Sequence, residues 1–534
     1  MDVLLINPPW STKDGNIWHG VKSTSPPLGL LYVAAFAEAR GRSVHVMDVN
    51  AERLHFEDIE QFVLLHQPQW VAFTAVTAQI IDTHRVAGIV KRVSPESKVV
   101  VGGVHATALP DEVLQDMNID YVIRGEGEES FFALVDGRPL ETIGGLSYRC
   151  DNKLQPIAHN AEAEPIKDLD SLPTPAYHLI KFELYKPAVG AYRRLPAVNM
   201  TMTRGCPGKC TFCNSAETAL RTRSPEHIVD EIQKLQATYG IREVSFYDDT
   251  FTIYKQSVAR LCDLIVEHGI DLTWSCFART DCISPPLLTK MKQAGCHQIL
   301  FGLESADPAI LETIRKPIDI EQTRKAVRMV QEAGIEVRAA FMFGNPGETV
   351  ASMRRTIDFA KELEPDIAIF NITTPYPGTQ MFTWAKENGY LRTLDWNDYD
   401  LANSVMELPT VSTEEINRMY KTAYREFFFR PGFLLRRLLR MRSFGDIKMN
   451  LQALRSIMFV RDTTLSPSAG ARSASRESIG RSGQAAGFSP RGSRISLAPQ
   501  EVRGSAQAEA CGSVAEARGS VAEANGPVKA DVCI

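Results

Sequence analysis

Short apolar runs alternate with amphipathic stretches along the first part of the chain. The apolar run over residues 3–7 leads into Pro8 and Pro9, which is typical of a buried parallel strand and its exit loop. Helical patterns separate the further runs, which are rich in β-branched and aromatic residues and cover residues 43–48, 70–75, 98–103 and 121–124. This alternation predicts a doubly wound, Rossmann-like α/β domain over residues 1–140.

A second series of strands and helices occupies residues 196–392. Its strand candidates are residues 198–203, 243–247, 272–277, 297–303, 337–343 and 367–372. A helical pattern separates each candidate from the next. Six βα units predict a partial (β/α)6 barrel of the TIM type, with its active site at the carboxyl ends of the strands.

The remaining segments differ in composition. Residues 141–195 are rich in proline and charge, which favours a connector between the domains. Residues 393–460 predict a helical extension that contains a basic amphipathic segment at 431–442. Packing on the barrel explains that segment most simply, and contact with a membrane surface or a greasy anionic substrate is the alternative. Residues 461–534 are rich in Ser, Ala, Gly and Arg, which predicts a disordered tail.

Composition narrows the class of protein. The 534 residues are 44% hydrophobic and 23% charged, as in soluble globular proteins of two or three domains. A formal net charge of −5 argues against a nucleic-acid partner. Ten cysteines in so long a chain are no disulfide framework, and the amino terminus does not have the pattern of a signal peptide. We therefore expect a cytoplasmic protein.

Three cysteines within eight residues carry the strongest chemical signal. They are Cys206, Cys210 and Cys213, spaced C-x3-C-x2-C. Thiolates suit iron and zinc, but a structural zinc site and an ordinary four-cysteine cluster both need four ligands. Three close thiolates suit a [4Fe–4S] cluster with one open iron, which Phe212 could shield from water. The alternative is a zinc site that borrows Cys276 or Cys282.

The cysteine spacing resembles the signature of the radical SAM superfamily. The resemblance implies reductive cleavage of S-adenosylmethionine at the cluster, and an electron donor of the flavodoxin or ferredoxin type is then expected. Motifs at the ends of the later barrel strands follow the order found in that superfamily. The resemblance implies that the residues contacting S-adenosylmethionine are Asp248, Asp249, Arg279, Glu304, Ser305, Gly344 and Pro346. Each of these motifs, taken alone, could be a helix cap or a turn.

Loops of the first domain resemble the cobalamin-binding domain of class B radical SAM proteins. The residues that this resemblance assigns to cobalamin are Pro8, Pro9, Asp48, Thr74, Gly102, Gly103, His105, Gly125 and Glu126. Taken singly, the glycine pair could be a tight turn, and His105 a buried, hydrogen-bonded histidine.

One departure from the cobalamin-binding pattern concerns the ligand of cobalt. The sequence lacks the Asp-x-His-x-x-Gly motif that supplies an axial histidine after the first strand. The nearest string, residues 82–88, is one residue too long and lies on a predicted helix. His19, in the correct loop, could substitute, but we expect cobalamin without a protein imidazole on cobalt.

Together the motifs imply a cobalamin-linked radical SAM enzyme that functionalises an unactivated carbon, most simply as a methyltransferase. In the mechanism of the resemblance, one S-adenosylmethionine methylates cobalamin and a second supplies the radical. The anaerobic magnesium-protoporphyrin monomethyl ester cyclase resembles the same architecture, so oxidation is the main alternative. Relatives that act on lipids extend the expected substrates to hydrophobic small molecules, either tetrapyrrole or lipid. A non-catalytic iron–sulfur regulator is a third hypothesis, against which the intact cysteines argue.

Overall fold

The computed structural model describes residues 1–10, 23–152, 155–188 and 190–439. Seven strands form its first sheet, in the order β2-β1-β3-β4-β5-β6-β7. They are β1 (Val3–Asn7), β2 (Val44–Asp48), β3 (Trp70–Thr74), β4 (Lys98–Gly102), β5 (Tyr121–Ile123), β6 (Leu146–Arg149) and β7 (Ile157–His159). The strands from β1 to β5 are parallel, and β6 and β7 run antiparallel at the edge.

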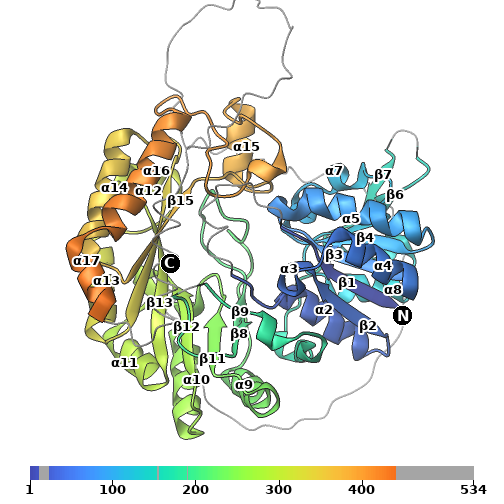
Figure 1. Ribbon diagram of the computed structural model, residues 1–534, viewed down its shortest axis with the longest axis horizontal. Helices are drawn as coiled ribbons and strands as arrows, with labels where there is room; N and C mark the ends of the chain where they lie inside the picture. Colours follow the sequence, from blue (N-terminus) through green and yellow to red (C-terminus); the bar gives the residue numbers. More distant parts are fainter. Residues whose placement is uncertain (11–22, 153–154, 189, 440–534) are drawn as a thin grey trace, which may run out of the picture. The chain divides into compact units, whose positions relative to one another are not determined.

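Helices cover both faces of this sheet (Figure 1). They are α2 (Leu28–Glu38), α3 (Val49–Glu52), α4 (Phe56–His66), α5 (Ile80–Val93), α6 (Val104–Ala108), α7 (Pro110–Leu114) and α8 (Glu128–Val135). Within β1, Leu5 packs in one core cluster with α2 and α8, whereas Leu4 and Ile6 pack in another with α4 and α5. Burial on both faces explains why these strands are continuous apolar runs. The predicted Rossmann-like domain is confirmed.

The segment over residues 141–195, expected to be a connector, differs from that expectation at its start. It begins with β6 and β7, which extend the first sheet before the chain crosses to the barrel. Both strands are short, and β7 has no fully buried residue. Neither strand is therefore an apolar run, and the hydrophobic pattern of the sequence did not predict them.

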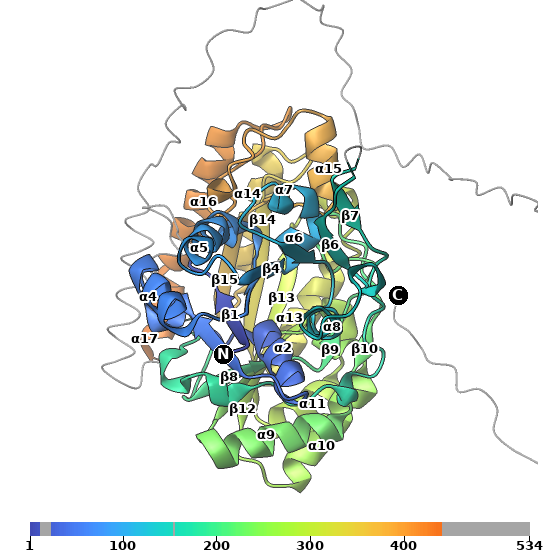
Figure 2. The same ribbon diagram turned by 90° about the vertical axis from the view of Figure 1, so that its right-hand side faces the viewer.

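Six parallel strands form the second sheet, in the order β15-β14-β13-β12-β11-β8 (Figures 1 and 2). They are β8 (Ala197–Met200), β11 (Glu243–Phe246), β12 (Thr273–Ala278), β13 (Cys296–Glu304), β14 (Glu336–Phe343) and β15 (Ile367–Ile372). The helices that follow them are α9 (Pro225–Tyr239), α10 (Lys255–Glu267), α11 (Pro285–Gln293), α12 (Pro308–Thr313), α13 (Ile320–Glu332), α14 (Val350–Leu363) and α15 (Gln380–Glu387). The predicted partial barrel is confirmed.

Two helices follow the barrel. Helix α16 (Thr413–Phe428) opens with the capping box of Ser412 and Glu415, and α17 (Pro431–Leu439) follows it. Phe433 of α17 is buried against aromatic rings of α16, as expected for a packing helix. The rest of the basic segment and the expected disordered tail lie outside the described residues. Within the described ranges, no helix is long and apolar enough to cross a bilayer.

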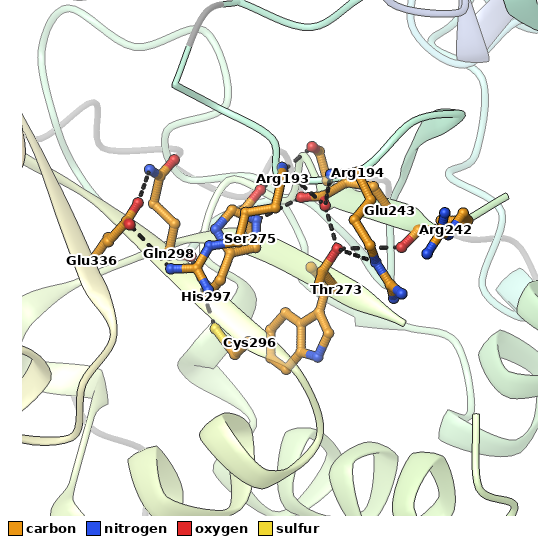
Figure 3. A network of polar contacts seen from close by, with 12 residues as sticks. Arg193, Arg194, Arg242, Glu243, Thr273, Ser275, Cys296, His297, Gln298 and Glu336 are labelled. Carbon is orange, nitrogen blue, oxygen red and sulfur yellow. Dashed lines mark hydrogen bonds and ion pairs between the residues drawn. The ribbon is translucent and has the colours of Figure 1, made fainter. Parts of the chain in front are cut away.

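A buried polar network joins the amino-terminal ends of the barrel strands (Figure 3). Glu243 begins β11, and its carboxylate lies 2.5 Å from Nε2 of His297 on β13. The backbone N–H groups of Arg193 and Arg194 donate to the same carboxylate, each at 3.2 Å, and the hydroxyl of Thr273 donates to it as well. One carboxylate therefore fixes the incoming chain to three strands.

Replacing Glu243 should destabilise the barrel. Glu243→Ala leaves two half-buried N–H groups and a buried imidazole without their partner and leaves the Thr273 hydroxyl only the carbonyl of Arg242, so we expect a loss of about 3 kcal/mol. The measurement is the thermal unfolding midpoint of the variant beside that of Glu96→Ala, whose side chain is exposed. Equal midpoints for the two variants would contradict this role of the network.

Candidate active site

A two-stranded stem holds the cysteine loop. Strand β9 (Thr203–Arg204) pairs antiparallel with β10 (Arg221–Thr222), and residues 205–220 form the loop between them. Gly205 has φ of +91°, and a Cβ atom there would collide with the carbonyl oxygen of Ala219. At Gly208, a Cβ atom would lie 3.2 Å from Sγ of Cys206. Both glycines are therefore needed for the path of the loop.

The three loop cysteines are free thiols and are half-buried. Burial raises the pKa of Cys210 and of Cys213, and the neighbouring thiols raise it further. The loop brings soft donors together away from full solvent, as a thiolate-bound cluster requires. Each thiolate of a [4Fe–4S] cluster binds its own iron, so the donor set fits such a cluster with one iron left open.

The zinc alternative needs a fourth ligand from Cys276 or Cys282. Cys276 is buried in the barrel core on β12, and the thiol of Cys282 lies 3.4 Å from a carboxylate oxygen of Asp281. Neither cysteine is therefore placed as a fourth ligand for the loop cysteines.

Two successive acids follow β11 and have different surroundings. Asp248 is buried, and its carboxylate accepts hydrogen bonds from the N–H of Met202 at 3.0 Å and from the hydroxyl of Thr203 at 2.6 Å. Burial raises the pKa of Asp248 to about 6. This acid therefore holds the chain that enters the stem. Asp249 is exposed, its side chain hydrogen-bonds to Ser215 of the cysteine loop, and its charge raises the pKa of Cys213, so it is the acid that faces the loop.

Beyond β12 and β13, charged side chains approach the loop. Arg279 makes a bidentate pair with Asp281, at 2.9 and 2.7 Å. Glu304 adopts a left-handed φ of +61° and accepts a hydrogen bond at 3.2 Å from Lys316, whose charge lowers the pKa of Cys210. Lys316 was not predicted, because a single lysine after a short helix has no distinctive pattern.

Three predicted residues serve internal structure. Ser305 is buried and accepts a hydrogen bond from the N–H of Asp307 at 3.2 Å. The N–H of Gly344 donates to Glu348 at 2.7 Å, and a Cβ atom on Gly344 would lie 3.1 Å from Ile416 of α16. Pro346 is buried in the same turn. The N–H of Gly344 is therefore not free for a cofactor in this arrangement.

A cavity of about 470 Å³ lies at the carboxyl ends of the first sheet's strands. Five residues predicted to contact cobalamin line it, namely Thr74, Gly102, Gly103, Gly125 and Glu126. The barrel closes it from the other side through Asn199, Thr201, Arg204 and Tyr247. Gly103 has φ of +94°, and a Cβ atom there would lie 2.8 Å from the backbone of Ala75. A wall of glycine backbone fits the close approach of a large planar cofactor and its tail.

The other predicted cobalamin residues lie outside this lining. The carbonyl of Pro8 accepts a hydrogen bond from Gln79 at 2.9 Å, and Pro9 follows it in the same turn. Asp48 caps α3 and accepts a hydrogen bond from the hydroxyl of Tyr185 at 3.1 Å. These side chains organise the loops rather than the cavity wall.

None of the described histidines lines this cavity. His105 is buried 3.2 Å from the hydroxyl of Thr77, and burial lowers its pKa to about 4. This is the buried, hydrogen-bonded histidine of the alternative interpretation. His84 lies on α5, as expected, and its ring nitrogen is 2.9 Å from Asp116. His19 lies outside the described residues. Among the described residues that line the cavity, none is a histidine.

An ionic bracket links the cavity to the cysteine loop. We define it as Glu126, Glu128, Arg204 and Arg221. The two arginines lie opposite each other in the stem, so each flank of the loop carries one. Arg221 binds Glu126 through two bonds of 3.0 and 2.7 Å, and Arg204 binds Glu128 at 2.7 Å. The sequence did not reveal this bracket, because its partners are far apart along the chain.

Two families match the chain. The B12 binding domain matches residues 18–135, and the radical SAM superfamily matches residues 200–360. An uncharacterized methyltransferase of Pyrococcus horikoshii is 36% identical over 82% of this chain and 94% of its own length. The anaerobic magnesium-protoporphyrin IX monomethyl ester cyclase of Rubrivivax gelatinosus is 28% identical, over 81% of this chain and 78% of the cyclase.

A solved structure has the same fold. It is the radical S-adenosylmethionine methyltransferase TsrM of Kitasatospora setae with cobalamin and a [4Fe-4S] cluster bound. The TM-score is 0.61 at 18% identity, and the similarity covers 85% of this chain and 100% of that one. At 18% sequence identity, the similarity is one of fold, that is, of how the two sheets are arranged.

Removing the bracket acids should loosen the cysteine loop. In Glu126→Gln with Glu128→Gln, two adjacent arginines lose their counter-charges, and we expect a cost of about 3 kcal/mol. The thermal midpoint and the iron and sulfide retained after anaerobic reconstitution should both fall. Glu129→Gln is the matched control, since that neighbouring acid is exposed. Unchanged iron retention in the double variant would contradict a role in holding the loop.

The buried acid Glu348 should make stability depend on pH. Burial raises its pKa from 4.5 to about 8, so the folded state holds a proton that the unfolded state releases across that range. The free energy of unfolding should therefore fall as pH rises from 4.5 to about 8. Glu348→Gln has no titrating group at this position. The thermal midpoint of the variant should therefore rise relative to that of the wild type as pH rises. A pH-independent difference between the two proteins would rule out the raised pKa.

Proposed function

Because the chain belongs to the cobalamin-dependent radical SAM enzymes, a family with methyltransferases and cyclases among its members, we propose that it methylates an unactivated carbon of a small molecule. The observation that carries the proposal is the shared cavity. Loops of the first sheet line one side of it, side chains of the barrel line the other, and the bracket fastens the cysteine loop to its rim. Residues assigned to the two cofactors thus meet at one cavity.

Within this proposal each cofactor has its own residues. Cys206, Cys210 and Cys213 hold the [4Fe–4S] cluster, and Phe212 covers it. Thr74 and the glycines of the cavity wall hold cobalamin, with no histidine on cobalt. When bound, these groups supply the electron that cleaves S-adenosylmethionine and the methyl group that is transferred.

Charges beside the cysteine loop suit the amino-acid end of S-adenosylmethionine. Asp249 offers a carboxylate to its ammonium, and Lys316 offers an ammonium to its carboxylate. Arg279 and Glu304 support this pair from their own strands, and Asp248 positions the stem. The roles of Ser305, Gly344 and Pro346 are then structural, in the turns that carry these side chains.

The cavity wall is largely apolar. Tyr247 stacks on Phe277 with ring centroids 5.3 Å apart, and the first domain adds Leu5, Val33 and Phe131. Apolar walls help to keep water away from a reactive radical intermediate. The apolar lining favours a small molecule with a substantial hydrophobic part.

Oxidation without methyl transfer is the second candidate function. The similarity to the Rubrivivax cyclase favours it, since that relative matches over most of both chains. An oxidised product would then replace a methylated one, while the cluster and the cavity keep the same residues.

The remaining partners follow from the chemistry. A one-electron donor of the flavodoxin or ferredoxin type would reduce the cluster, and thiol ligation favours the reducing cytoplasm. Leu435 of α17 is 58% exposed, which leaves peripheral contact with a membrane as part of the proposal. Against such contact, Arg436 pairs with Glu364 at 3.0 Å and Phe433 faces α16.

Anaerobic reconstitution with iron, sulfide and hydroxocobalamin tests the proposal. We expect a cluster EPR signal and bound corrinoid after desalting, and the signal should disappear in the variant Cys206→Ala with Cys210→Ala and Cys213→Ala. Label from methyl-labelled S-adenosylmethionine should then enter the product. A product without label would favour oxidation, and a cluster without corrinoid would overturn the methyl-transfer proposal.

A further inference from the structure

Arg338 of β14 lies on the inner face of the barrel. Along β14, Val337, Ala339 and Phe341 are buried beneath the helices, and the residues between them are less buried. Side chains of a barrel strand alternate between the two faces, so Arg338 is directed toward the barrel interior. Its partners in register are Leu300 on β13 and Ile367 on β15, both apolar. The guanidinium therefore stands in hydrophobic surroundings.

No carboxylate neutralises Arg338 within the described residues. They give its guanidinium no hydrogen bond and no ion pair, and its Nε atom is shut off from solvent without a partner. Glu336, two residues earlier on the same face, is engaged by Arg193 at 3.0 Å and by Gln298 at 3.2 Å (Figure 3). Burial lowers the pKa of Arg338. A half-buried guanidinium with no counter-charge among the described residues and one buried, unpartnered nitrogen points to a ligand of opposite charge.

Tyr247 links this arginine to the cavity. Its side chain lines the cavity and stacks on Phe277, and its charge acts to raise the pKa of Arg338, so the two side chains are near each other. The cysteine loop has other charges beside it, those of Lys316, Glu304 and Arg279. We therefore assign Arg338 to the barrel side of the cavity. It is separate from the residues that were assigned above to the amino-acid end of S-adenosylmethionine.

We propose that Arg338 binds an anionic group, a carboxylate or a phosphate, on the substrate. The inference rests on the proposed function and narrows it to amphiphilic anions. A planar guanidinium can bind either group through two parallel hydrogen bonds, while Leu300, Ile367 and Phe277 contact the apolar remainder. The carboxylate of S-adenosylmethionine has the same chemistry, so the test must separate these two sources.

The test compares two probes of the same shape and different charge. Reconstituted full-length protein is titrated with 4-phenylbutyrate and with the neutral 4-phenylbutyramide, followed by calorimetry or ligand-observed NMR. We expect the wild type to prefer the carboxylate about tenfold, the size of one charge-assisted pair. Arg338→Met should remove the preference, and Arg338→Lys should keep part of it. Arg328→Met, on the exposed face of α13, should behave like the wild type.

Two further measurements decide between roles. S-adenosylhomocysteine should bind equally to the wild type and to Arg338→Met. Loss of that binding in the variant would assign the arginine to the cofactor and overturn the proposal. Removing an unpaired buried charge should leave the thermal midpoint unchanged or higher. A lower midpoint, or equal binding of both probes by the wild type, would also overturn it. Cluster and corrinoid spectra of the same samples test the proposed function separately.

Discussion

The ionic bracket between the stem and the first sheet is the contact on which the arrangement depends. Glu126 lies in a loop that lines the cavity, Glu128 begins α8 beside it, and their arginine partners flank the cysteine loop. Two arginines opposite each other would repel, so the stem is favourable only with both acids in place. The pairing of these four charged side chains therefore sets where the cysteines lie relative to the glycine residues that line the cavity.

The barrel adds a second constraint from its opposite end. Glu243 joins the incoming chain to three strand starts, while the strand ends carry the charged side chains near the cysteines. Such a division is common in (β/α) barrels, where one end stabilises the fold and the other carries the chemistry. Because the amino-terminal ends of the strands are fixed in this way, the loops at their carboxyl ends can keep strained backbone conformations, such as the left-handed φ of Glu304.

The hydrophobic pattern predicted both sheets because their parallel strands are apolar runs, buried on both faces in the first sheet and rich in β-branched and aromatic residues in the barrel. The strand β7 was missed because it has three residues and none of them is fully buried. Cysteine spacing singled out the cysteine loop, and glycines such as Gly103 marked the cavity wall. Sequence could not assign Asp248 and Asp249 to their different roles, because only the fold decides which carboxylate is turned inward. Arg338 was missed because its lack of a counter-charge exists only in three dimensions.

The raised pKa values of the loop thiols have a consequence for maturation. Burial favours the protonated form of Cys210 and Cys213, whereas a metal binds only their thiolates. Assembly of a cluster on these cysteines would therefore release protons from the loop. Acidification would then favour the protonated thiols over a bound cluster.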